Sequence, residues 1–147
     1  MRNAFQGKAQ SLGIAGSVIL DGWRNDIASC LQGLDLFMMP SRFEGMSLAL
    51  LEAMAAGLCC CVSDVDGMGE AIQHGVNGYL CAPENVPKWC EQIEMVVTDP
   101  ARRAEVGRRA RDVAHGRFSI DSMASGTVGV YREVMRSQQE SRQRKSA

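Results

Sequence analysis

The chain has 147 residues, of which 46% are hydrophobic and 22% are charged, and its formal net charge at pH 7 is -1. This length is enough for one domain with its own hydrophobic core, so the fold requires neither a metal ion nor disulfides. The near-neutral charge excludes a general electrostatic preference for nucleic acid, anionic membranes or acidic substrates, and partners must be sought at local sites.

Apolar runs alternate with helix-like segments along the chain, which is the pattern of repeated strand–helix units around a parallel sheet. Four strands are predicted, at SVILDG (17–22), DLFMMP (35–40), LCCCVSD (58–64) and NGYLCA (77–82). The first three are nearly continuous apolar runs, as expected of strands that are buried on both faces. The sequence therefore predicts the α/β class, with a Rossmann-like parallel sheet of about four strands and flanking helices.

Helices are predicted between and after these strands, at residues 25–33, 47–56, 67–74, 87–98, 100–115 and 120–137. Gly57 and Gly75 are the expected stop residues of the second and third helices. Asp99 and Ser119 are suited to cap the last two helices. We expect residues 1–136 to form one domain and the polar, mildly basic residues 137–147 to form a disordered tail.

The six cysteines do not have the spacing of a disulfide framework or a zinc site. Residues 59–61 are consecutive cysteines in a predicted strand, where neighbouring side chains point to opposite faces. Cys30, Cys81 and Cys90 form no C-x-x-C pair. We therefore expect six reduced thiols, as in a cytoplasmic protein. No apolar run approaches the roughly 20 residues that span a bilayer.

The histidines and the arginine-rich segment have structural interpretations. His74 and His115 lie near predicted helix ends, where a cation favours the helix dipole, so capping is favoured over catalysis. Five arginines between residues 102 and 111 recur at helical spacing, but Glu105 and Asp112 are interleaved with them. This pattern favours a solvated helix face over a nucleic-acid-binding surface.

Ligands of a doubly wound sheet bind beyond the carboxyl ends of its strands, so the candidate loops start at Gly22, Pro40, Asp64 and Ala82. The second loop leads into EGMSLALLE, residues 44–52, with one acid at each end. Ser47 is suited to cap the following helix, whose free N–H groups form an anion site between the two acids. Carboxylates repel phosphate but accept hydrogen bonds from hydroxyls, which suits a nucleoside diphosphate sugar. On spacing alone, a solvated loop acid and an exposed helix acid remain the alternative.

Three stretches together resemble one known family: PSRFEGMSLALLEAMAAG, SDVDGMGEAIQHGVNGYL and DPARRAEVGRRARDVAHGRFS. They are similar to the C-terminal half of retaining, nucleotide-sugar-dependent glycosyltransferases of the two-domain GT-B fold, the group 1 family that builds bacterial polysaccharides and glycolipids. The similarity extends from about Val18 to Tyr131. The chain would then be part of the C-terminal, donor-binding domain of such an enzyme.

The resemblance assigns roles position by position. Glu44 matches the first acid of the family's E-x7-E motif, which contacts the transferred sugar near the reacting centre, and Glu52 matches the second acid, which holds the ribose. Gly22 and Arg24 match a glycine–basic loop after the preceding strand. Trp23 either flanks the nucleobase or packs in its loop. The cradle for sugar and diphosphate matches the backbone amides of Gly45, Met46, Ser47 and Leu48.

Asp64, Val65 and Asp66 spell the D-x-D with which glycosyltransferases of another fold hold a divalent cation. Two acids in a loop after a strand usually form a turn, and the resembling family uses no bound metal. We therefore expect no metal site and no cofactor besides the substrate. The family ordinarily has glycine at the position of Asp66, so this loop departs from its pattern.

The resemblance also implies missing parts. The family's acceptor domain, two further strands and a basic pair that neutralises the departing diphosphate would precede this chain, and Lys8, Lys88 and Lys145 match none of these basic positions. Either the strand at 17–22 pairs directly with the strand at 35–40, or a sheet edge stays open. Because the family's terminal helix packs on the other domain, we expect Val130, Tyr131 and Val134 to be exposed.

These observations predict the donor-binding half of a glycosyltransferase that moves a hexose-type sugar, with retention of configuration, to a glycan or lipid-linked acceptor. The alternative is a non-catalytic nucleotide-sugar-binding subunit or an inactive fragment that needs a partner chain with the acceptor domain. The expected partners are the nucleotide sugar, the acceptor and such a second chain, but no nucleic acid. The expected location is the cytoplasm, with a peripheral position at the inner membrane face left open.

Overall fold

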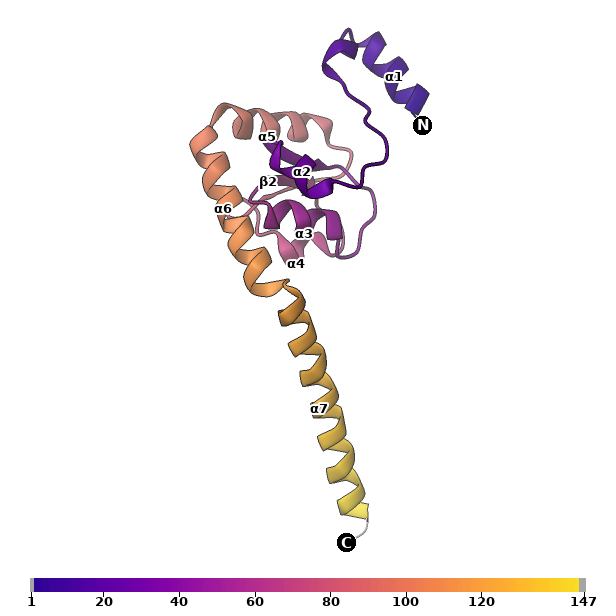
Figure 1. Cartoon of the computed structure of the whole chain (residues 1–147), viewed down its shortest axis with the longest axis vertical. Coiled ribbons are helices and arrows are strands. Elements are labelled where there is room, and N and C mark those ends of the chain that lie inside the picture. Colours follow the sequence, from indigo (N-terminus) through magenta and orange to yellow (C-terminus); the bar gives the residue numbers. More distant parts are fainter. Residues whose placement is uncertain (1, 146–147) are drawn as a thin grey trace.

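The structure, a computed structural model, describes residues 2–145, with side chains up to residue 139. The globular body is a small parallel sheet with helices on both faces (Figure 1). The elements in chain order are α1 (Arg2–Ser11), the 3-10 turn η1 (Ala15–Ser17), α2 (Ile27–Gln32), β1 (Leu36–Met39), α3 (Leu48–Ala55), β2 (Cys59–Ser63), α4 (Met68–Ala71), β3 (Tyr79–Cys81), α5 (Val86–Thr98), α6 (Pro100–Arg117) and α7 (Ile120–Lys145).

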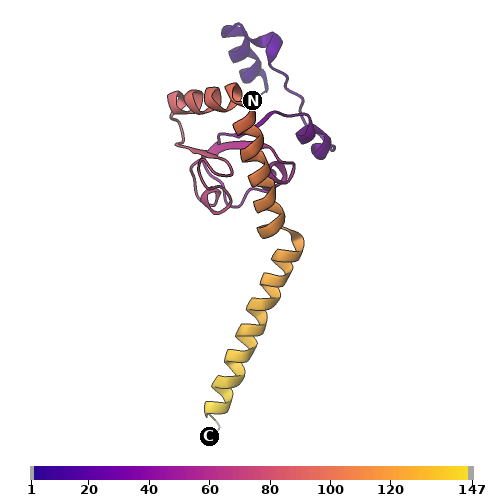
Figure 2. The same cartoon turned by 90° about the vertical axis from the view of Figure 1, so that its left-hand side faces the viewer.

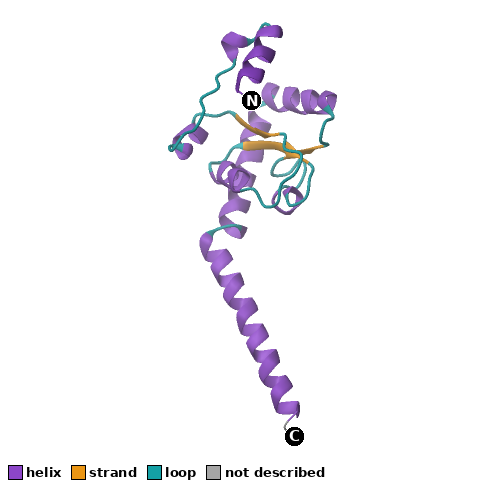
Figure 3. Cartoon of the chain, turned by 90° about the vertical axis from the view of Figure 1, so that its right-hand side faces the viewer, coloured by secondary structure: helices purple, strands orange, loops and turns teal. Residues whose placement is uncertain are grey.

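The sheet has the order β1-β2-β3, and its neighbouring strands are parallel (Figure 3). Leu36 pairs with Cys59 and Cys61 pairs with Tyr79. The central strand β2 is buried along its whole length, because its five residues are apolar or small and both of its edges are paired. The predicted parallel α/β architecture is confirmed, with three strands in the described part of the chain.

The first predicted strand, at residues 17–22, does not form, so this prediction is wrong. Val18 has extended backbone angles, but the segment pairs with no strand, and the Ile19 side chain is 85% exposed. The carbonyl oxygen of Leu20 instead accepts a hydrogen bond from Arg2 Nη2 at 2.6 Å. This segment and α1 stand off the body, so the edge of β1 stays open among the described residues, which was one of the two predicted outcomes.

The cysteine run of β2 divides between two hydrophobic cores, one on each face of the sheet. Cys60 and Val62 pack with Leu50 and Met54 of α3, and Cys59 packs on the opposite face. The second core also contains Cys61, Tyr79, Cys81, Trp89, Val96 and Val106. All six cysteines are free thiols, as predicted, and burial raises the pKa of Cys60 well above its usual range.

Helix α6 crosses the turn between α3 and β2 at very short range. Gly57 stops α3 with a left-handed φ of +82°, as predicted. A Cβ atom on Gly107 would lie 2.1 Å from the Gly57 carbonyl oxygen, so only glycine fits on this face of α6. The two glycines thereby fix α6 against the end of α3.

Helix α4 is shorter than predicted because a side chain ends it. The buried Asn77 donates from Nδ2 to the Ala71 carbonyl at 2.9 Å, and its Oδ1 accepts from the Gln73 N–H at 2.6 Å. The chain is therefore extended after Ala71, and the predicted stop at Gly75 is wrong. His74 is no helix cap: its Nδ1 accepts a hydrogen bond from the Leu80 N–H at 3.1 Å.

The last three helices agree with the sequence at their starts. Asp99 Oδ1 accepts from the Arg102 N–H at 2.9 Å, and Ser119 Oγ accepts from the Ser122 N–H at 3.2 Å. Helix α7 continues through residues 138–145, where a disordered tail was expected, and residues 146–147 of that tail lie outside the described residues. Within residues 2–145, no helix has the length and apolar character needed to cross a bilayer.

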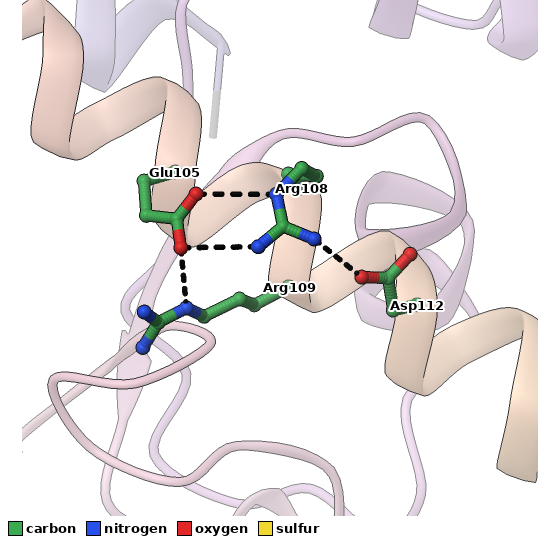
Figure 4. Close-up of polar contacts among 4 residues, drawn as sticks. All are labelled: Glu105, Arg108, Arg109 and Asp112. Carbon is green, nitrogen blue, oxygen red and sulfur yellow. Dashed lines mark hydrogen bonds and ion pairs between the residues drawn. The ribbon is translucent and has the colours of Figure 1, made fainter.

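The arginine-rich face of α6 is a solvated ion-pair network, as predicted (Figure 4). Glu105 accepts hydrogen bonds from Arg108 Nε at 3.1 Å and from Arg109 Nε at 2.8 Å. Arg108 also pairs with Asp112 at 2.9 Å. These pairs connect residues three or four positions apart, the spacing that places side chains on one helix face. His115 lies in the last turn of this helix, near its carboxyl end.

Candidate functional site

The loop between β1 and α3 ends at a capped helix start. Ser47 is extended and buried, and its Oγ accepts a hydrogen bond from the Leu50 N–H at 3.4 Å. The Leu51 N–H bonds to the Ser47 carbonyl, which begins the regular helical pattern. The amides of Leu48 and Ala49 precede that pattern and have no acceptor within the helix. Two N–H groups are therefore available to an anion at this end of α3.

Glu44 lies in the same loop, half-buried, and its Oε1 accepts a hydrogen bond from Ser41 Oγ at 2.9 Å. The hydroxyl holds the carboxylate within the loop while leaving its second oxygen for another donor. Gly45, Met46 and Leu48 are exposed, so this part of the loop is open to a ligand. The predicted site residues from Glu44 to Leu48 thus lie on one continuous segment beside the start of α3.

A contact with the next loop fixes this segment. Gly67 follows β2 and has a left-handed φ of +82°, and a Cβ atom there would lie 2.4 Å from the Gly45 carbonyl oxygen. The loop after β2 therefore supports the backbone between Glu44 and Ser47. Gly67 was not among the predicted site residues, although a glycine directly after a strand-end loop is a signal for such a contact.

Glu52 lies on α3, about one and a half turns into the helix, and is exposed. It borders a hollow of about 430 Å³ between α2 and α3. The other residues that line this hollow are Asn25, Ile27, Ala28, Leu31, Gln32, Ala55 and Ala56. The two acids of the segment thus flank the helix start, and the second one faces a largely apolar hollow.

Gly22 and Arg24 lie on the linker before α2, apart from the β1–α3 loop in sequence. Gly22 has a φ of +80°. The guanidinium of Arg24 donates to Asp26 Oδ1 at 2.8 Å and to Asp21 Oδ2 at 2.8 Å. The hydrogen bond to Asp26 raises the pKa of Arg24 and lowers that of Asp26. Trp23 is 91% exposed and therefore does not pack in its loop.

The loop after β3 also reaches the β1–α3 loop. Arg42 Nη2 forms an ion pair with Glu84 Oε1 at 2.9 Å. Glu84 has a φ of +62°, which is uncommon for a residue other than glycine. Both residues line a hollow of about 350 Å³ with apolar walls from Met38, Val86, Trp89 and Ile93. This connection was not predicted, because it joins loops that are far apart in the chain.

The D-x-D loop shows no cluster of candidate metal ligands. Asp64 and Asp66 are exposed, and the Asp64 N–H donates to the Cys81 carbonyl at 2.8 Å. Within residues 2–139, no three His, Cys, Asp or Glu side chains are close enough to hold a metal ion together. A hollow of about 660 Å³ lies away from the strand-end loops and is bordered by α4, α6 and the segment 72–80.

Comparison with known proteins places this arrangement in a family. The profile described as "Glycosyl transferases group 1" matches residues 1–113, so the likeness begins earlier than the expected Val18. N-acetyl-alpha-D-glucosaminyl L-malate synthase of Bacillus anthracis is 32% identical over 127 residues, which cover 86% of this chain and 33% of that protein. D-inositol 3-phosphate glycosyltransferase of Rhodococcus erythropolis is 32% identical over 128 residues, 86% of this chain and 29% of that protein.

Solved structures show the same fold. HepE of Anabaena, determined in complex with UDP, superposes with a TM-score of 0.85 at 23% identity and covers 89% of this chain and 36% of its own. A sucrose-phosphate synthase of Thermosynechococcus elongatus superposes with a TM-score of 0.84 at 22% identity over 92% of this chain and 35% of its own. The chain spans about a third of the length of the curated relatives it matches.

Proposed function

The chain belongs to the group 1 glycosyl transferases, and from this premise we propose that its β1–α3 segment binds a nucleoside diphosphate sugar. The donor would give up its sugar with retention of configuration, and the acceptor would be a glycan or a lipid-linked sugar. No metal ion takes part in this proposal. The observation that carries it is the capped start of α3, where the free amides of Leu48 and Ala49 lie between two carboxylates.

The diphosphate would bind at the N-terminus of α3. Unpaired amides and the positive end of the helix dipole both favour an anion there. Gly45, Met46, Leu48 and Ala49 are exposed, which gives the phosphates access to the amides of Leu48 and Ala49. The HepE structures were determined with UDP and with UDP-glucose, which supports a ligand of this class for the shared fold.

The two acids would hold the ends of the donor. Glu44, oriented by Ser41, would accept hydrogen bonds from hydroxyls of the transferred sugar, and Glu52 would accept them from the ribose. Each hydrogen bond to an ionised acid contributes about 1.5 to 3 kcal/mol. The hollow beside Glu52 would take part of the nucleoside, with Gly22 and Trp23 on the preceding linker.

A transferase must also stabilise the charge of the departing diphosphate, usually with a cation. Arg24 is the predicted basic residue of this site, and in the structure it is paired with Asp21 and Asp26. Binding of a diphosphate would therefore have to exchange two carboxylates for phosphate oxygens. This pairing favours the second candidate: a nucleotide-sugar-binding part that acts with a partner bearing the acceptor domain.

Calorimetric titration tests the donor site. UDP, GDP and ADP, each alone and as its glucose form, are titrated into the 147-residue chain. We expect binding of one base series and a loss of roughly 10- to 100-fold in affinity on Glu52→Ala, because one charged hydrogen bond is removed. Glu94→Ala, which removes an exposed acid of α5, is the matched control and should leave affinity unchanged. No binding, or equal binding by Glu52→Ala, would disprove the assignment.

Activity separates the two candidates. Release of sugar from the bound donor by the purified chain, or its transfer to a lipid-linked acceptor, would show a functional transferase and contradict a binding-only role. Donor binding without turnover, restored to turnover by an added acceptor domain of a relative, would support the split arrangement.

A further inference from the structure

A hydrogen bond on the linker before α2 fixes the orientation of the Asn25 side chain. Trp23 Nε1 lies 2.9 Å from Asn25 Oδ1. The indole N–H can only donate, so the amide must turn its oxygen toward Trp23. The linker runs along the outside of the body in both views (Figures 1 and 2), and both side chains are exposed. The bond therefore orders a side chain that burial does not hold in place.

The same amide borders the hollow of about 430 Å³ between α2 and α3. Trp23 is not among the residues that line this hollow, so the oxygen of Asn25 is turned away from it and the Nδ2 group is the end offered to a ligand there. The Nδ2 group carries two N–H donors and no acceptor. The hollow thus has, at one edge, a fixed group that can only donate.

The other groups around the hollow leave the reading of a ligand's edge to Asn25. Glu52 borders the hollow too, and the proposed function gives its carboxylate to the ribose. Gln32 is exposed and can rotate, so its amide can present either the oxygen or the nitrogen. The rest of the wall is apolar: Ile27, Ala28, Leu31, Ala55 and Ala56. A flat ring can lie against such a wall while its polar edge meets the fixed amide.

We infer that Asn25, held by Trp23, selects a nucleobase with a carbonyl group at this edge, so that the donor is a uridine or guanosine diphosphate sugar rather than an adenosine one. Uracil and guanine carry carbonyl oxygens, O4 and O6, where adenine carries its N6 amino group. The carbonyl accepts a hydrogen bond from Nδ2, whereas the amino group would leave two donors facing each other. The inference rests on the proposed function, because it names the class of nucleotide sugar that the same site takes.

Calorimetric titration of UDP, GDP and ADP into the 147-residue chain tests this selection. We expect UDP or GDP to bind at least about fivefold tighter than ADP, the effect of one exposed hydrogen bond. Asn25→Asp keeps an oxygen for Trp23 but turns an acceptor toward the base, so the ratio of the affinities should shift at least about fivefold in favour of ADP. The ratio is the quantity to compare, because the added negative charge weakens the binding of all three diphosphates alike.

Two further variants separate the roles of the residues. Trp23→Phe removes the indole N–H and frees the amide to rotate, so the preference over ADP should fall to less than about twofold. Gln32→Glu places the same charge at the same hollow as Asn25→Asp and is the matched control, whose ratio should stay within about twofold of that of the parent chain. Thermal unfolding should give the parent midpoint for all three variants, since none of these residues belongs to either core.

Affinity for ADP equal to or above that for both UDP and GDP would overturn the inference, as would an unchanged ratio in Asn25→Asp or an equal shift in Gln32→Glu. Full preference in Trp23→Phe would overturn the role given to Trp23. These results would leave the donor site itself in place. If none of the three diphosphates bound, the proposed function would be disproved, and this inference with it.

Discussion

Glu44 and Glu52 occupy different environments, which suits different roles at one ligand. Glu44 is half-buried, and the Ser41 hydroxyl restricts its carboxylate, so it can present one oxygen in a fixed direction. Glu52 is exposed on a regular helix, where its position is set by the backbone and its side chain remains adjustable. A fixed acid suits the reacting sugar, where orientation matters most, and an adjustable acid suits the ribose.

Gly67 is the residue whose replacement should disturb the site most directly. Gly67→Ala would place a methyl group against the Gly45 carbonyl and would force an unfavourable left-handed φ on alanine. We expect a loss of about 1 to 3 kcal/mol in the free energy of unfolding, together with weaker donor binding. Chemical denaturation and calorimetry measure the two effects.

Gly69→Ala is the matched control for this prediction. A Cβ atom on Gly69 would meet nothing within 4 Å, and the residue lies inside α4, where alanine is the better helix former. This variant should be as stable as the parent chain or more stable. Equal behaviour of the two variants would show that the contact between the loops after β1 and β2 has no importance.

At the scale of elements, the loops at the carboxyl edge support one another. The β1–α3 loop contacts Gly67 after β2 and is paired through Arg42 with Glu84 after β3. Glu84, the acid of this pair, has a left-handed φ of +62° in the turn before α5. Three strand-end loops therefore act as one unit in holding Glu44, although each is short.

We expect the Arg42–Glu84 pair to affect the order of the loop more than global stability. Both side chains are more than two-thirds exposed, so Glu84→Asn, which still tolerates a positive φ, should change the free energy of unfolding by about 1 kcal/mol or less. Amides of residues 42–47 should nevertheless exchange with deuterium several-fold faster, because a constraint on the loop is gone. The reversed pair, Arg42→Glu with Glu84→Arg, should restore slow exchange. Unchanged exchange in Glu84→Asn would contradict this role.

Helix α6 should respond to acid through Glu105. Hydrogen bonds from Arg108 and Arg109 lower the pKa of Glu105, so its contribution to stability is complete above the unfolded-state pKa, near 4.3, and is lost as pH falls through the lower folded-state pKa. The difference in stability between the parent chain and Glu105→Gln should therefore shrink between about pH 5 and pH 3. Denaturation curves across this range measure it. In a background that lacks both arginine charges, the difference should be independent of pH.

At the scale of the whole molecule, the sequence pattern correctly predicted those helices and strands whose structure depends on residues nearby in the sequence. The helix starts at Ser47, Asp99 and Ser119 and the buried run of β2 were predictable because caps and apolar runs act locally. The exposure of Val130, Tyr131 and Val134 was also predicted, from the packing of that helix in the family. The early end of α4 was not predicted, because no helix-stop residue marks it: the side chain of Asn77, six residues after Ala71, takes up the Ala71 carbonyl.

The absence of the strand predicted at residues 17–22 has a non-local cause. Its apolar residues have strand propensity, but a strand needs a neighbour to pair with, and no described strand lies beside it. In the site, the acids and the helix cap were predicted on local pattern and family resemblance. The contacts through Gly67 and Glu84 were not, because they join loops that meet only in the folded sheet.

The open edge of the sheet should set the order in which the molecule exchanges its amides. Strand β2 is paired on both sides and fully buried, whereas β1 is paired on one side only, and the segment of residues 2–26 is largely exposed and unpaired with the sheet. Amide exchange is slowest where hydrogen bonds are buried in the core and fastest where only local opening is needed. Hydrogen–deuterium exchange should therefore show greatest protection in residues 59–63, less in 36–39 and least in 2–26. Equal protection of β1 and β2 would mean that another segment covers the edge of β1 in solution. The variant Met38→Lys, which places a charge beside this edge, would then restore fast amide exchange in residues 36–39.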